Sequence, residues 1–78
     1  MDKEETIQRM IELTAGSTSD KDYFGMSKIL DSSYVNAADS SRTKVHLEVL
    51  HTEGRLRRIR AINNRSDNFF YRAVIDEK

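Results

Sequence analysis

Apolar residues near the N-terminus recur at helical spacing. They are Ile7, Met10 and Ile11, with Leu13 at the margin of the same face. This period predicts a helix from about Lys3 to Thr14. Asp2 before this helix and Glu5 in its first turn have the spacing of a capping box. The small and polar residues AGSTSD then predict the end of the helix and a loop.

A second apolar run begins after this loop. Its members are Tyr23, Phe24, Met26, Ile29 and Leu30. They predict a second helix that starts at Asp20 or Asp22 and continues to about Asp31. The segment DSSYVNAADSS that follows has the composition of a loop, with room for one helical turn around residues 36–39. A short strand before the second or the third helix also fits the pattern.

The next stretch, SRTKVHLEVLHTEG, predicts a third helix with Ser40 or Ser41 as its N-cap. Gly54 fits the C-terminal cap, because glycine takes the left-handed conformation at no steric cost. The apolar residues spread over a wide arc, which predicts that much of the helix is buried: Val45, Leu47, Val49 and Leu50. The polar side carries Ser41, Lys44, Glu48 and His51.

After Gly54 the period changes to that of strands. Leu56, Ile59 and Ile62 are mixed with arginines, and residues 69–75 are aromatic or β-branched apart from one arginine and one alanine. The polar segment NNRSDN between them predicts the connection of a hairpin. Three helices followed by two strands predict an α+β fold of the winged helix-turn-helix type, one domain over residues 1–78. Each strand has enough apolar residues to cover one side of a three-helix core.

Composition excludes several classes of function. The chain has 78 residues, no cysteine and three glycines, so it offers no disulfide framework, thiolate metal site or glycine-rich phosphate loop. His46 and His51 do not share a helical face, so we expect no metal site. No serine, histidine and acid have the sequence context of a catalytic nucleophile, so we also expect no cofactor and no enzymatic activity. The apolar runs are too short to span a membrane, and the first residues do not read as a targeting signal. These features predict a cytoplasmic protein without a small-molecule substrate.

The net charge of zero hides an uneven distribution. Residues 1–41 carry a net charge of −4, residues 42–72 carry +5, and the last six residues add −1. A basic half favours a polyanionic partner. Alternatively, the two halves neutralise one another within the fold.

The hairpin region holds most of the candidate arginines. Arg57, Arg58, Arg60 and Arg72 would project along its edges and outer face, with Asn64 and Arg65 at its tip. The planar guanidinium donates two parallel hydrogen bonds to a phosphate, and at a tip it can enter the minor groove of DNA. Arg72 lies among aromatic residues, so we expect it to be structural and to pair with an acid.

The predicted start of the third helix is the second candidate region. Free backbone N–H groups there suit a phosphate. Ser41, Arg42, Thr43 and Lys44 would add side-chain contacts to phosphates or guanine edges. Glu48, one turn further on, would repel phosphate or face a cytosine amino group.

The segment SRTKVHLEVLHTEGRLRRI resembles the recognition helix and first wing strand of winged-helix regulators. With the aromatic strand NFFYRAV, the layout is similar to that of the small bacterial regulators of pilus and fimbrial operons, the FaeA/PapI-like group. A short winged helix from a phage or plasmid fits the residues equally well. The resemblance implies transcription control through double-stranded DNA, beside a larger regulator or as a homodimer. It implies base and phosphate contacts by Ser41, Arg42, Thr43 and Lys44, and wing contacts by Asn64 and Arg65.

Two other functions stay open. In one, the same fold is a protein-interaction module whose arginines bind an acidic protein surface. In the other, Phe69, Phe70 and Tyr71 stack on single-stranded nucleic acid or RNA, which requires exposed rings. We expect at least alternate rings to be buried.

Overall fold

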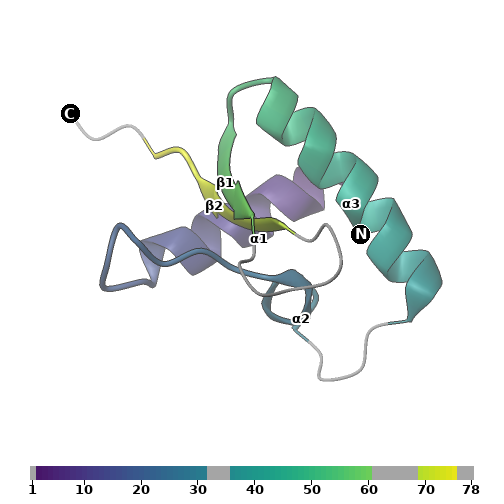
Figure 1. Cartoon of the computed structure of the whole chain (residues 1–78), viewed down its shortest axis with the longest axis horizontal. Coiled ribbons are helices and arrows are strands. Elements are labelled where there is room, and N and C mark those ends of the chain that lie inside the picture. The colour runs from purple at the N-terminus through teal and green to yellow at the C-terminus, as the bar shows by residue number, and fades with distance from the viewer. Residues whose placement is uncertain (1, 32–35, 61–68, 76–78) are drawn as a thin grey trace.

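In the described part of the chain, three helices precede two strands (Figure 1). The structure is a computed structural model and describes residues 2–31, 36–60 and 69–75. Its elements are α1 (Lys3–Ala15), α2 (Met26–Ile29), α3 (Ala37–Thr52), β1 (Leu56–Arg60) and β2 (Phe69–Ala73). The predicted α+β class and the order of helices before strands are confirmed. No helix in this part of the chain is long and apolar enough to cross a membrane.

Local signals determine α1 as predicted. Asp2 is its N-cap and forms the capping box with Glu5. Ile7 and Met10 are buried, but Ile11 is 37% exposed, so its predicted place in the apolar face is wrong. Two threonines fill the buried face instead, as their hydroxyls find backbone partners. They are Thr6, which donates to the carbonyl oxygen of Asp2, and Thr14, which accepts from the amide of Ala73.

The predicted second helix is wrong over its first half. Only Met26–Ile29 is helical, and Phe24 lies in an extended segment beside β2. The amide of Phe24 donates to the carbonyl of Tyr71 at 2.8 Å, and the amide of Tyr71 donates back at 2.9 Å. These bonds satisfy the backbone as well as a helical turn would, so an isolated β-bridge forms here, although no strand does.

The predicted N-cap of the third helix is also wrong. α3 begins at Ala37, and Asn36 caps it by accepting a hydrogen bond from the amide of Asp39. Asparagine is as good an N-cap as serine, and the earlier start adds helical hydrogen bonds. The prediction for the other end is confirmed, because Gly54 follows the helix with φ of 79°.

α3 buries a narrower face than predicted. Leu47 and Leu50 are fully buried, and Thr43 lies beside them at 1% exposure. Val45 is 60% exposed and Val49 is 39% exposed, so the prediction that both are buried is wrong. The core lies on one side of the helix only, and the wide apolar arc extends past it into solvent.

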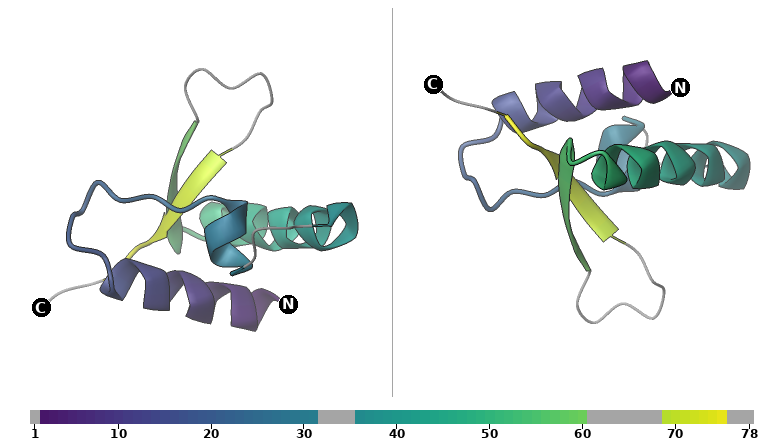
Figure 2. Two further views of the ribbon diagram at one scale, coloured as in Figure 1. Left: turned by 90° about the horizontal axis from the view of Figure 1, so that it is seen from below. Right: turned by 90° about the horizontal axis from the view of Figure 1, so that it is seen from above.

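The two strands pair antiparallel, with Leu56 opposite Ala73 and Arg60 opposite Phe69. α1 and α3 pack against each other but run in clearly different directions (Figure 1), and the strands lie near the C-terminal ends of both helices (Figure 2). The hydrophobic core lies between these elements: Ile7, Met10, Ile29, Leu47, Leu50, Leu56, Tyr71 and Ala73. Phe69 is half-buried, Phe70 is exposed and Tyr71 is buried, so the rings do not form the open stacking surface that single-strand binding requires.

Candidate nucleic-acid interface

α3 lies along one edge of the molecule, and its outer side is not covered by another described element (Figure 1). Ser41, Arg42 and Lys44 are exposed on it, whereas Thr43 faces the core and presents no hydroxyl at the surface. These residues lie in the second turn of α3, so they do not surround free backbone N–H groups as predicted.

Arg42 and Lys44 lie on different sides of α3. Residues two apart on a helix do not face each other, and the buried Thr43 lies between these two. Lys44 lies on the side that faces the strands, where it shares a hollow with Phe69 and Tyr71. Arg42 lies towards the opposite side. The two cations therefore flank the exposed face of α3, one on each side.

The register of the strands separates the arginines of the hairpin. Arg58 and Arg60 lie on the same face as the buried residues Leu56 and Tyr71, while Arg57 and Arg72 lie opposite each other on the other face. The prediction that all four project along the edges and outer face is wrong, because consecutive residues of a strand point to opposite sides.

Arg58 links the hairpin to α3. Its Nη1 donates to both carboxylate oxygens of Glu48, at 2.8 and 2.7 Å. Its Cζ lies 4.0 Å from the centre of the Phe69 ring, within the range of a cation–π interaction. The Glu48 carboxylate, followed by the Tyr71 hydroxyl, raises the pKa of Arg58, so the guanidinium stays charged. Glu48 therefore binds an arginine and does not carry the uncompensated charge that would repel phosphate.

The other hairpin arginines have different surroundings. The Cζ of Arg60 lies 5.6 Å from the centre of the same Phe69 ring. Arg72 donates to the carbonyl oxygens of Ser19 and Asp22 at 3.0 and 2.8 Å. Its predicted structural role is confirmed, but the predicted pairing with an acid is wrong, because within the described residues its bonds go to backbone oxygens. They hold the loop after α1 against β2.

Among the described residues, exposed cations without an ion pair lie on α2, α3 and β1 and in the loop between α1 and α2, where they include Lys28 of α2 and Lys21 of the loop. Within the described residues, Arg42 and Lys44 on α3 and Arg57 on β1 form no salt bridge. A shallow hollow of about 250 Å³ lies between α3 and β2 beside Lys44. Its lining residues are Met26, Ser40, Lys44, Glu48, Phe69, Phe70 and Tyr71. Asn64 and Arg65, predicted for the tip of the wing, lie outside the described residues.

Sequence reasoning missed two parts of this surface. The Phe69 ring lies beside the guanidinium groups of both Arg58 and Arg60. The alternation of side chains along a strand could have indicated this position, since Phe69 shares a face with Tyr71. The wide apolar arc of the third helix wrongly predicts that Val45 and Val49 are buried. Thr43, Leu47 and Leu50 define the buried side of the helix, and the helical period then places both valines away from the core.

In the described part of the chain, no three His, Cys, Asp or Glu side chains are grouped so that they could hold a metal ion. Comparison with known proteins adds no family: no family model, curated protein or solved structure matches the chain. The similarity to pilus and fimbrial regulators stays a prediction.

Proposed function

We propose that the chain is a winged helix-turn-helix protein that binds double-stranded DNA and acts as a small transcriptional regulator. In this proposal α2 and α3 form the helix-turn-helix, α3 enters the major groove, and β1 and β2 form the wing. The extended segment at Phe24 and the two strands cover one end of the helices, which leaves the outer side of α3 available.

The observation that carries the proposal is the exposed face of α3 with an unpaired cation on each side. A helix in the major groove has a phosphate backbone on both flanks. Arg42 on one side of α3 and Lys44 on the other could each contact a different phosphate backbone. Two cations on the same side could reach one backbone only. Phosphate contacts of this kind position the protein and supply most of its affinity.

The hairpin extends the same basic surface. Arg58 cancels the charge of Glu48, the one acidic residue of α3 beyond its first turn. Arg60 lies further along β1, on the same face of the hairpin as Arg58. A single protomer makes few contacts, so specific binding would use a homodimer or a larger regulator.

Fluorescence anisotropy of a labelled mixed-sequence duplex tests the proposal at about 50 and about 200 mM salt, a range over which several phosphate contacts change affinity by orders of magnitude. We expect salt-dependent binding that is weakened in an Arg42→Ala/Lys44→Ala variant and that has a shallower salt slope there. Lys21→Ala is the matched control, because it removes an exposed lysine from the loop between α1 and α2. The absence of binding by the wild type at the lower salt would refute the proposal.

A protein-interaction module is the second candidate, and the outer face of the hairpin favours it. Ile59 and Phe70 are cross-strand partners that are 46% and 38% exposed, next to Arg57. Exposed apolar residues beside arginine are typical of protein interfaces. Here the arginines would bind an acidic protein surface.

The two candidates respond to different variants. If the interaction module is right, Arg57→Glu/Ile59→Ser abolishes capture of a cellular partner by cross-linking, whereas Arg42→Ala/Lys44→Ala leaves it intact. If DNA binding is right, the second variant has the larger effect on duplex affinity. Equal loss in both variants, with an unchanged circular dichroism spectrum, would contradict this division of the surface.

A further inference from the structure

The outer face of α3 carries aliphatic side chains where its surroundings do not require them. Val45 and Val49 are four residues apart, so they are neighbours on the helix surface. They are 60% and 39% exposed and do not belong to the core cluster. β-branched residues are also poorer helix formers than alanine or leucine. Neither helix formation nor the core explains these two valines.

The other residues of this face are polar. Ser41 and Thr52 lie one turn before Val45 and two turns after it, and both are exposed. α3 contains no asparagine or glutamine, the residues that pair with adenine edges. Between the flanking cations, the helix therefore presents methyl groups, small hydroxyls and the carboxylate of Glu48, which Arg58 binds.

In the major groove, the C5 methyl of thymine is the apolar group that a base pair displays. Aliphatic side chains on a helix in the groove can pack against it. Charge favours DNA over an apolar partner helix as the ligand of this face, because the cations Arg42 and Lys44 flank the valine pair on its two sides. The pair is also far smaller than the roughly 800 Å² that each partner buries in a stable protein interface.

We propose that Val45 and Val49 recognise thymine methyl groups, so that the preferred DNA site carries T·A pairs opposite the middle of α3. This inference rests on the proposed DNA binding and specifies the sequence class that it reads. Arg42 and Lys44 supply affinity, and the valines supply discrimination.

The test begins with a selection from a random duplex pool, and the recovered duplex is then the probe. A second duplex replaces the thymines of the site with deoxyuridine, which lacks only the methyl group and pairs identically. We expect the affinity of the wild type to fall about four-fold for each methyl group that a valine contacts. Val45→Ala should bind the two duplexes more nearly equally, while Val74→Ala, at an exposed valine after β2, should keep the full difference.

The outcomes separate this inference from the proposed function. Salt-dependent binding with equal affinity for the thymine and deoxyuridine duplexes would refute methyl recognition and leave DNA binding intact. The absence of binding to either duplex would refute both. Self-association without DNA that is abolished in Val45→Lys would assign this face to a second copy of the chain and overturn the inference.

Discussion

Gly54 ends α3 in a backbone conformation that other residues avoid. Its φ is 79°, and its amide donates to the carbonyl of His51 while the amide of Arg55 donates to that of Leu50. This pair of bonds is a Schellman motif, which satisfies two carbonyls at the end of the helix. It also turns the chain directly into β1, so the angle between α3 and the hairpin depends on this residue.

We expect Gly54→Ala to destabilise the protein by about 1–2 kcal/mol, the cost of a left-handed conformation for a residue with a Cβ. No atom lies within 4 Å of the added methyl group, so the backbone alone accounts for the loss. Thermal unfolding should show a midpoint lower by about 4–8 °C for each kcal/mol. Gly16→Ala is the control: Gly16 has φ of −82° and should tolerate alanine without loss. Equal effects in both variants would contradict the argument.

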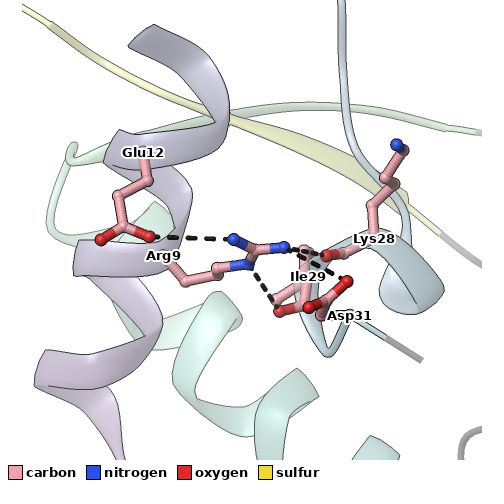
Figure 3. Close-up of polar contacts among 5 residues, drawn as sticks. All are labelled: Arg9, Glu12, Lys28, Ile29 and Asp31. Carbon is pink, nitrogen blue, oxygen red and sulfur yellow. Dashed lines mark hydrogen bonds and ion pairs between the residues drawn. The ribbon is translucent and has the colours of Figure 1, made fainter. Parts of the chain in front are cut away.

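Among the secondary-structure elements, the short helix α2 depends on contacts with α1 for its stability. A helix of four residues is far too short to be stable alone. Arg9 of α1 donates from Nε to the carbonyl oxygen of Ile29 at 3.3 Å and from Nη2 to that of Lys28 at 3.2 Å (Figure 3). The same guanidinium lies 3.9 Å from a carboxylate oxygen of Asp31. These contacts cap the C-terminal end of α2 and fix it against α1.

Arg9→Ala should loosen α2 while α1 keeps its structure. We expect a loss of about 1–2 kcal/mol, since two hydrogen bonds from a charged but partly exposed group disappear. Amide hydrogen exchange should accelerate more at Ile29 and Leu30 than at Met10. Gln8→Ala, at an exposed neighbour on α1, should leave these rates unchanged. Slow exchange at Leu30 in Arg9→Ala would show that α2 does not need this cap.

For the whole molecule, Tyr71 connects the elements of the core. Its backbone pairs with Phe24, and its side chain lies 5% exposed beside Arg58. Burial raises the pKa of the Tyr71 phenol above its ordinary value of about 10, and Arg58 opposes the shift. The folded state therefore holds this proton to a higher pH than the unfolded state does.

It follows that Tyr71 makes stability depend on pH in the alkaline range. The contribution of Tyr71 to the free energy of unfolding is complete below the ordinary pKa of about 10 and is lost as pH rises through the higher pKa of the folded state. Urea unfolding between about pH 9 and pH 11 should show a steeper decline for the wild type than for Tyr71→Phe, which has no phenol to ionise. Parallel declines would mean that other groups dominate alkaline unfolding.

The sequence by itself determined the features that depend on a few consecutive residues. The capping box at Asp2 and Glu5 and the left-handed Gly54 act through local backbone bonds, so they form whatever surrounds them. The aromatic and β-branched residues after Gly54 likewise predicted two strands. The sequence also supplied the residue types of the candidate interface, because charge and hydrogen-bonding chemistry belong to the side chain.

The tertiary structure decided which surfaces these residues share. Phe24 has helical spacing, yet it pairs with Tyr71 from the other end of the chain. Asn36 and Ser40 both suit an N-cap, and the choice between them moved Arg42 and Lys44 into the second turn. Val45 is exposed because α3 packs on the core through its opposite side. Each outcome depends on packing between segments distant in sequence, whose competing arrangements satisfy the local rules equally well.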